Sequence, residues 1–380
     1  MQSVRDGTIP AILSIDIEPD TFQIFPDATP KWRGHKDAGP FADWLRELLF
    51  RRSAVAPRFG WYLRMDPQIE QVFGRADAAA STFPSRVAQI KADGDYLGVH
   101  MHPLRWSAGQ RCWLHDFHDR DWLRHCTHFS LDAFEQWSGT PATLYRAGAG
   151  FLGDDIVGVL EDRGVQFELS LEPVGPAQHE TDAVGTGVDS SPIVGQYMSC
   201  ENAPVSPYRP DPADFRQPDR SGTRRLHIVP LTAGPYSIPK RDWWSRSKQS
   251  LHRFRPPLQQ HLYNPASPWP SADYFWDLVA HRMSTMPRPY LSLAIRTDAP
   301  DSVPSQRIRN LFAALVHHPL GERLRFDEPH EAVRDYLDDA ASISTGRWLA
   351  PTPPVKGWTT VHHNGGHTVD QLPTSFTRGH

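Results

Sequence analysis

Short apolar runs and amphipathic segments alternate along the first part of the chain. Residues 11–15 and 58–64 are apolar runs that stop at polar residues, whereas residues 41–50 carry leucines at helical spacing. Short apolar runs bounded in this way predict buried strands, and the leucine spacing predicts a helix with one apolar face. Strand and helix therefore follow one another from the first element.

The same alternation continues to residue 171 and resumes near the C-terminus. Further strands are expected at 96–102, 142–145, 165–171, 226–230, 290–295 and 324–326. Further helices are expected at 85–92, 132–137, 154–163, 272–282, 305–317 and 330–337. This order predicts the α/β class, with a parallel sheet that is either open or closed into a barrel and has helices packed outside.

Three segments break the alternation. Residues 174–221 and 236–271 are rich in Pro, Gly, Asp and Ser or otherwise irregular, and residues 346–380 are rich in Pro and His. We interpret the first two as loop insertions in a single domain, residues 1–345, and the third as a poorly ordered tail.

Composition narrows the class of protein. The 380 residues are 39% hydrophobic and 22% charged with a net charge of -4, which is typical of a globular protein and gives no reason to expect nucleic acid as a partner. Three scattered cysteines indicate neither a disulfide framework nor a cysteine zinc site. We find no leader-like apolar run and no membrane-length apolar stretch, so we expect a cytoplasmic protein. The sequence leaves the oligomeric state open.

Four expected strands end in reactive side chains, and the carboxyl ends of parallel strands are where α/β folds bind ligands. Residues two apart on a strand point to the same face, so a carboxylate pair and a histidine pair could converge. Two imidazoles and one carboxylate are typical of a catalytic zinc site with an open position. Each residue also has a purely structural interpretation, as a helix cap, a packed histidine or a surface ion pair. The residues are Asp16 and Glu18, Asp66, His100 and His102, and Arg146.

Three motifs, in this order and at these separations, resemble the polysaccharide deacetylase family with its NodB-like domain. They are Ser14-Ile15-Asp16-Ile17-Glu18, Gly98-Val99-His100-Met101-His102-Pro103 and Tyr145-Arg146-Ala147-Gly148. The resemblance covers residues 10–176 and, more loosely, the chain up to residue 298. It implies a deformed β/α barrel of about seven parallel strands with long irregular loop insertions.

The resemblance also implies roles for these residues. Asp16 would be the general base and Arg146 the residue that holds it ionised. The metal ligands would be Glu18, His100 and His102, with zinc as the expected divalent ion. We further expect Asp66, Arg296 and Asp298 to bind substrate.

The sequence departs from the family pattern in three places. One residue separates the two acids, and the second acid is Glu18 where the family often has adjacent aspartates. One residue, instead of three, separates the two histidines. The strand at 290–295 continues into Arg296-Thr297-Asp298 without the histidine that usually serves as general acid. Another group, such as His227, His115 or His118, would then have to donate the proton.

These observations predict a metal-dependent hydrolase that removes an N- or O-linked acetyl group from a sugar of a cell-envelope polysaccharide or its precursor. The expected partner is a carbohydrate or another acetylated small molecule. Two alternatives stay open. One is a non-catalytic carbohydrate-binding or accessory protein on the same barrel, motivated by the missing histidine. The other is a hydrolase of another linear carbon–nitrogen (amide) bond.

Overall fold

The structure is a computed structural model, and it describes ten segments of the chain. These are residues 7–25, 32–148, 151–173, 193–195, 200, 202–233, 235–236, 260–261, 271–298 and 305–337. Contacts divide the chain into one compact unit, Met1–Tyr236 with Pro257–Ala350, and a second unit, Ser237–Pro256 with Pro351–His380, whose residues all lie outside the described segments. The predicted tail, half of the first predicted insertion and most of the second also lie outside them.

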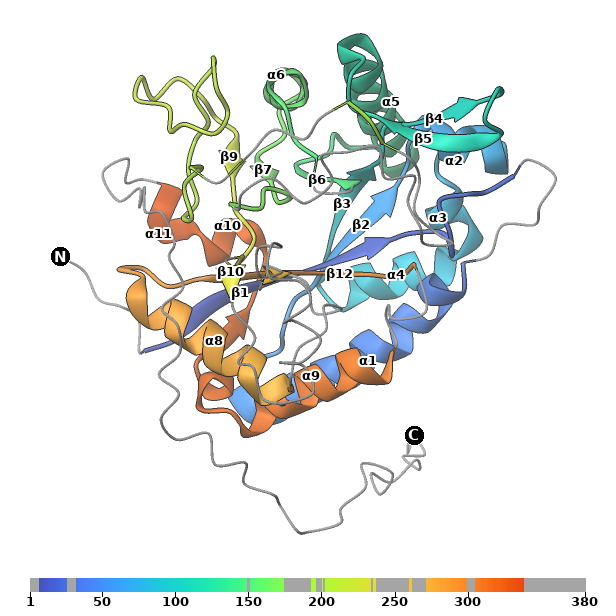
Figure 1. The fold of residues 1–380 in the computed structure, drawn as a ribbon. Coiled ribbons are helices and arrows are strands. Elements are labelled where there is room, and N and C mark those ends of the chain that lie inside the picture. The colour runs from blue at the N-terminus through green and yellow to red at the C-terminus, as the bar shows by residue number, and fades with distance from the viewer. Residues whose placement is uncertain are drawn as a thin grey trace, which may run out of the picture. The chain divides into compact units, whose positions relative to one another are not determined.

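A parallel sheet forms the centre of the described chain (Figure 1). Its strand order is β12-β1-β2-β3-β6-β7-β9, and β13 pairs with β1 as well. Every pairing in this sheet is parallel, which confirms the predicted α/β class with about seven parallel strands. The strands are β1 (Ile9–Ile17), β2 (Gly60–Arg64), β3 (Tyr96–Met101), β6 (Leu144–Ala147), β7 (Phe167–Glu168), β9 (His227–Ile228), β12 (Leu291–Arg296) and β13 (Leu324–Phe326).

The two ends of the strand order approach each other. The backbone N–H of Thr232, four residues beyond β9, donates to the Ser292 carbonyl of β12 at 2.8 Å. The Tyr290 hydroxyl donates to the Pro230 carbonyl at 2.6 Å. The sheet therefore curls until its edges are joined by hydrogen bonds, which makes it a deformed barrel.

Aromatic and aliphatic side chains fill the inner face of this curled sheet. Tyr62 of β2 lies beside Gly98 of β3, and Tyr96 lies beside Gly60. A Cβ at either glycine would overlap a tyrosine ring, so the glycines leave the space that the rings occupy. Two short helices, α10 (Pro329–Ala332) and α11 (Arg334–Leu337), contribute to the same cluster. Its buried members are Ile12, Tyr62, Tyr96, Leu144, Phe167, Leu169, Val229, Tyr290, Ala332, Val333 and Tyr336.

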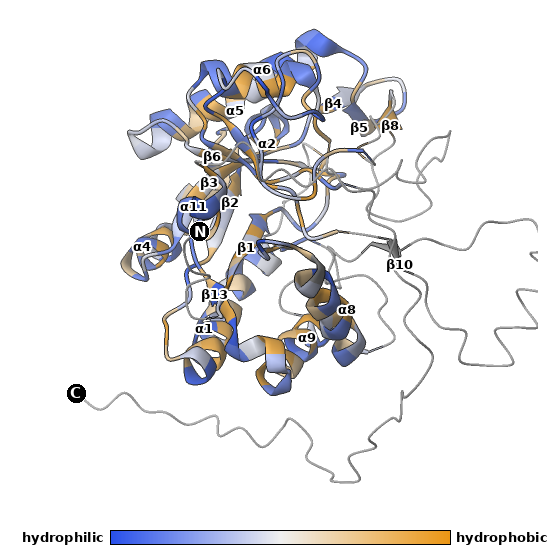
Figure 2. Cartoon of the chain, turned by 90° about the vertical axis from the view of Figure 1, so that its left-hand side faces the viewer, coloured by the Kyte–Doolittle hydropathy of each residue, from blue (hydrophilic) through white to orange (hydrophobic). Residues whose placement is uncertain are grey.

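Helices cover the outer face of the sheet, where the larger hydrophobic cluster lies. Figure 2 shows hydrophobic and hydrophilic residues alternating around α1, α8 and α9, as in amphipathic helices. No described helix is long and apolar enough to cross a membrane. The helices are α1 (Arg33–Ser53), α2 (Pro67–Phe73), α3 (Ala78–Thr82), α4 (Pro84–Ala92), α5 (Arg120–Ser138), α6 (Asp154–Asp162), α8 (Ala272–Thr285) and α9 (Gln306–His317), with the short 3₁₀ helix η2 (Pro319–Glu322).

Several predicted elements have different lengths in the structure. The helix expected at 41–50 begins at Arg33 and includes Pro40, because the residues before Pro40 are also packed against the core. The helix expected at 132–137 begins at Arg120, where Asp119 accepts hydrogen bonds from two backbone N–H groups of the first turn. The strand expected at 165–171 pairs as a strand at two residues only. The helix expected at 330–337 is divided into α10 and α11.

A small sheet beside the barrel was not predicted. It consists of β4 (Leu104–Ser107), β5 (Cys112–Asp116) and β8 (Ile193–Val194). Strands β4 and β5 form an antiparallel pair directly after the His100 motif, and β8 joins β5 in parallel. A separate two-stranded pair joins β10 (Pro235–Tyr236) to β11 (Gln260–His261).

Candidate metal centre

The sheet register brings the predicted residues to one end of the barrel. His100 of β3 lies between Arg64 of β2 and Arg146 of β6, and Asp16 is near the end of β1. Neighbouring residues in a parallel sheet point to the same face, so these side chains share the inner face of the sheet at its carboxyl end. This is where parallel α/β folds place their ligand sites.

Glu18, His100 and His102 converge on one point and are all buried. The Oε1 atom of Glu18 is 2.8 Å from His100 Nε2 and 2.7 Å from His102 Nε2, and the two Nε2 atoms are 3.1 Å apart. Ligand atoms around a tetrahedral ion at about 2.0–2.1 Å are separated by about 3.3 Å. The three atoms are therefore close to the spacing that one small divalent ion requires.

Arg64 is a buried guanidinium beside this cluster. It donates to Glu18 Oε2 at 2.8 Å and to Asp66 Oδ2 at 2.6 Å, and it also contacts Gln68. Burial alone would raise the pKa of Glu18, but the charges of His102, Arg64 and His100 hold that pKa well below its usual value. Glu18 is thus an anion whose Oε1 faces the histidines.

The two histidines differ in their surroundings. Burial alone would lower the pKa of His100, but Asp16 and Glu18 raise it overall, whereas burial leaves the pKa of His102 well below its usual value. The second ring nitrogen of His100 is 3.1 Å from the Arg146 carbonyl, and that of His102 is 2.9 Å from His115 Nε2. Both rings therefore have a hydrogen-bond partner on the edge that faces away from Glu18.

Asp16 and Arg146 form a two-point ion pair within the barrel. Arg146 Nε donates to Asp16 Oδ1 at 2.6 Å and its Nη2 to Oδ2 at 3.0 Å. Asp16 Oδ1 is 4.0 Å from His100 Nδ1, so the pair adjoins the histidines. The fork geometry fixes the orientation of the carboxylate.

The buried charges cancel only if one of the two imidazoles is protonated. Three carboxylates, Asp16, Glu18 and Asp66, face two guanidiniums, Arg64 and Arg146. With both imidazoles neutral the cluster carries one negative charge in excess. A cation at the three-ligand point would offset this charge, so the donor set and the charge balance both fit a divalent metal.

Asp66 has a different position from the one expected of a substrate-binding residue. It is fully buried, caps α2 through the Ile69 N–H, pairs with Arg64 and accepts from the His102 N–H at 3.0 Å. All of these partners belong to the protein, so Asp66 supports the cluster from behind. Asp66 therefore agrees with the alternative interpretation from the sequence, in which it caps a helix.

Arg296 and Asp298 follow β12, next to Asp16. Arg296 pairs in register with Asp16, its side chain is 49% exposed, and its Nε lies 3.2 Å from Asp298 Oδ1. Asp298 is buried, and burial raises its pKa to about 6. Between them, Thr297 accepts from the Glu18 N–H at 2.8 Å and fixes the backbone of that ligand.

His227 lies outside the metal centre, beside Phe167 and Arg209. Its ring stacks on Phe167, and Arg209, which also donates to the Leu337 carbonyl of α11, donates to its Nε2 at 3.2 Å. It therefore sits near the amino ends of the strands, away from Asp16. This position does not suit the proton donor that the sequence suggested.

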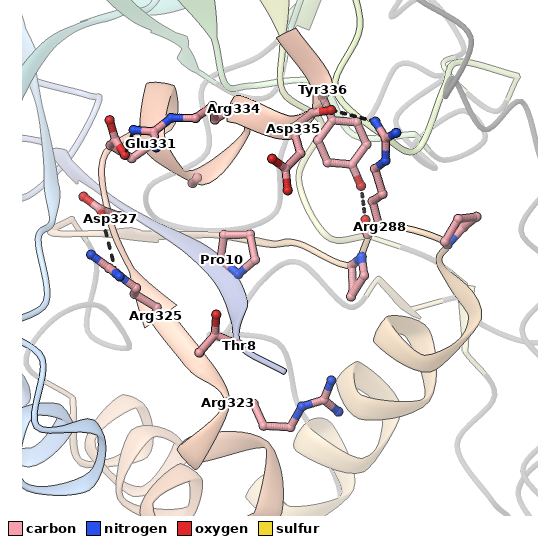
Figure 3. Close-up of a pocket in the computed structure, with 13 residues that line it drawn as sticks. Thr8, Pro10, Arg288, Arg323, Arg325, Asp327, Glu331, Arg334, Asp335 and Tyr336 are labelled. Atoms are coloured by element: carbon pink, nitrogen blue, oxygen red, sulfur yellow. Dashed lines mark hydrogen bonds and ion pairs between the residues drawn. The ribbon is translucent and has the colours of Figure 1, made fainter. Parts of the chain in front are cut away.

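A hollow of about 160 Å³ also lies at the amino ends of the strands (Figure 3). Charged side chains of both signs line it, and some of them are paired, as Arg325 is with Asp327 at 3.6 Å and Arg334 with Glu331. None of the predicted site residues lines it. We therefore do not consider it the candidate centre.

The sequence interpretation missed three residues of the centre. Arg64 was taken only as part of a strand, although it follows the same alternation as Tyr62 and could have been placed on the inner face. Gly148 belongs to the arginine motif but has no reactive side chain, and a Cβ there would overlap the His102 ring. No local pattern could predict the role of Thr297, because its hydrogen-bond partner Glu18 is 279 residues away.

The described structure is thus a curled α/β barrel with a candidate three-ligand metal centre. No protein-family model matches the sequence. No curated protein matches it either.

Solved structures of similar fold do match. One is a protein from Mycobacterium smegmatis provisionally named a polysaccharide deacetylase, at 14% identity, with 88% of this chain and 93% of that chain covered and a TM-score of 0.47. Puue allantoinase matches at 11% identity over 87% and 91% of the two chains, with a TM-score of 0.46. A peptidoglycan deacetylase from Bacillus subtilis matches at 8% over 87% and 93%, with a TM-score of 0.34.

Proposed function

We propose that the chain is a metal-dependent hydrolase that removes an acetyl group from a sugar or a related acetylated molecule. The observation that carries this proposal is the convergence of Glu18, His100 and His102 beside the Asp16–Arg146 pair, at the carboxyl end of a parallel barrel. A divalent ion held by the three ligands, with zinc as the first candidate, would supply Lewis-acid chemistry that polarises an acyl carbonyl and acidifies water.

Asp16 is the proposed general base. Arg146 orients its carboxylate, and its neighbour His100 places it next to the three-ligand point. A carboxylate so placed can take a proton from a water that attacks the acyl carbon. Glu18 is engaged by Arg64 and by both histidines, so the two acids have separate tasks.

Arg296 and Asp298 are the proposed substrate contacts. The half-exposed guanidinium can bind a hydroxyl or carbonyl oxygen of the substrate. Asp298, whose pKa burial raises to about 6, is also our candidate for delivering a proton to the leaving group. It lies two residues beyond the register partner of Asp16.

The experiment compares two substrates on the same preparation. Acetate release from an activated acetyl ester, whose leaving group needs no proton, and from an N-acetylated amino-sugar oligomer is measured with zinc-loaded and chelated full-length protein. We expect zinc-dependent release from both, slower for the amide, and an Asp298→Asn loss confined to the amide. Metal-independent release, or none from any acetylated compound tested, would contradict the proposal.

One observation favours a second function. Strand β12 ends in Arg296, Thr297 and Asp298, without a histidine in the family's general-acid position. A barrel that kept the metal and lost catalysis would bind a carbohydrate without cleaving it. Saturable sugar binding by zinc-loaded protein, together with no acetate release, would establish this function instead.

A further inference from the structure

The ring of His102 is held on both of its edges. Its Nε2 is 2.7 Å from Glu18 Oε1, and its Nδ1 is 2.9 Å from His115 Nε2. Both histidines are buried, with exposed fractions of 1% and 4%. A neutral imidazole carries one ring proton, so the partner on one edge decides what the other edge can do.

A ring that binds a metal through Nε2 needs its proton on Nδ1 and an acceptor for that proton. We propose that His115 is a positioning residue that accepts the Nδ1–H of His102 and so holds His102 in its metal-binding tautomer. This inference rests on the metal centre proposed above. It assigns His115 a task other than that of a substitute acid.

The opposite tautomer fits the same heavy-atom distances. In that arrangement His102 Nε2–H donates to Glu18 Oε1, and His115 donates to His102 Nδ1. His102 could then not take an ion through Nε2. The role of His115 therefore decides between the two arrangements. If His115 accepts a proton from His102, the centre can bind a metal; if it donates one, the three side chains form a closed hydrogen-bond network.

The small sheet holds His115 in place. Its backbone pairs with Leu104 of β4 on one side and with Ile193 of β8 on the other. Its ring lies edge-on to Phe22 at 5.8 Å and stacks on Phe117 at 5.6 Å. Two strands and two aromatic rings thus fix the imidazole against His102.

Phe22 also covers the partner ring. Its centroid is 4.7 Å from that of His102, and the Arg64 guanidinium lies 5.3 Å from it on its face. Its backbone carbonyl accepts from Gln68 at 2.6 Å, so the loop after β1 is fixed as well. The His102–His115 hydrogen bond is therefore shielded from water, where losing the acceptor costs most.

The experiment measures zinc affinity of the full-length protein by competition with a chromophoric chelator. His115→Leu removes the acceptor, and His115→Gln offers an amide oxygen near the same place. His118→Leu is the matched control, because His118 is exposed and three residues away. We expect zinc binding about 10- to 100-fold weaker in the Leu variant, a change of a few-fold at most in the Gln variant, and none in the control.

Ring-nitrogen NMR on zinc-loaded wild-type protein gives a second test that needs no variant. It should find His102 Nδ1 protonated and His115 Nε2 unprotonated. Wild-type affinity in His115→Leu, or a protonated His115 Nε2, would overturn the positioning role. Failure of the wild-type protein to bind zinc would instead refute the metal centre itself, so the two failures can be told apart.

Discussion

At the scale of single residues, each of the two buried arginines binds a different acid of the site. Arg64 binds Glu18, and Arg146 binds Asp16. Arg64 donates to Glu18 Oε2, so Oε1 is left to face the two histidines. Arg146 donates to both carboxylate oxygens of Asp16. This division gives a physical reason for one acid to act as ligand and the other as base, which the spacing of the acids could not provide.

Replacing the proposed base separates these tasks. We expect Asp16→Asn to keep about one zinc per chain but to lose at least about 100-fold in hydrolysis, because an amide cannot take the proton. Metal analysis and acetate release measure the two effects, and circular dichroism checks the fold. Asp121→Asn, at a side chain that is 93% exposed, is the control. Loss of zinc with little loss of specific activity would exchange the roles of Asp16 and Glu18.

A second buried acid gives a prediction about pH. Burial raises the pKa of Glu168 from 4.5 to about 7, and its Oε2 has no hydrogen-bond partner among the described residues. The folded state therefore holds this proton more tightly than the unfolded state does. Between pH 4.5 and 7 the unfolded chain ionises first, so the free energy of unfolding falls as pH rises, by on the order of 3 kcal/mol from this group.

Glu168→Gln should remove this pH dependence. Denaturant unfolding of both proteins at pH 4.5 and pH 8 gives the difference between their free energies of unfolding at each pH. The contributions of the other titrating groups largely cancel in this difference. We expect the variant to gain stability relative to wild type by about 2–4 kcal/mol between the two pH values. An unchanged difference in the free energy of unfolding would mean that folding does not raise the pKa of Glu168.

At the scale of elements, the site depends on how closely β6 approaches the end of β3. Gly148 follows β6, and the His102 ring occupies the space that a side chain at that position would need. The ring can therefore reach Glu18 only if residue 148 has no Cβ. This gives a physical reason for the glycine in the arginine motif.

Gly148→Ala should displace the His102 ring and weaken zinc binding at least about 10-fold, measured by chelator competition. Gly158→Ala is the control, because Gly158 lies within α6 and an added Cβ there would have no atom within 4 Å apart from its chain neighbours and the backbone of its own helix. That control should bind zinc as wild type does and be slightly more stable, by about 0.5–1 kcal/mol. Unchanged zinc affinity in Gly148→Ala would mean that His102 is not a ligand or can bind from another position.

The sequence predicted the barrel strands more accurately than the elements around them. Buried strands such as β1 and β3 consist of apolar runs that are visible locally. Strands β4 and β5 are short and contain several partly exposed residues, and β5 pairs with β8 about 80 residues later, so no continuous apolar run marks them. The sequence therefore suggested His115 only as a possible proton donor. The ion pair between Arg64 and Glu18 likewise joins residues that are 46 positions apart, so no local pattern predicts it.

At the scale of the whole described molecule, the parallel register determines the site. Asp16, Arg64, His100 and Arg146 are distant in sequence, yet successive pairings align their strands so that all four meet at the carboxyl end. The sequence could predict this meeting, because carboxyl ends of parallel strands share an edge. It could not predict which oxygen of Glu18 is left for an ion, since that depends on side-chain contacts.

The opposite end of the barrel has a different chemistry. The cluster around Tyr290 and Tyr336 closes it, and the charged hollow lies beside them (Figure 3). The cluster of metal-binding groups lies at the other end. We therefore propose that the reaction takes place at the end that holds Glu18, His100 and His102.

Zinc titration of chelated full-length protein tests the central claim most directly, with the metal content of dialysed samples measured by elemental analysis. Wild type should retain about one zinc per chain, and the His100→Ala/His102→Ala double variant should retain none while staying folded. Stoichiometric zinc in the double variant, or none in wild type, would contradict the metal centre on which the proposed hydrolase rests.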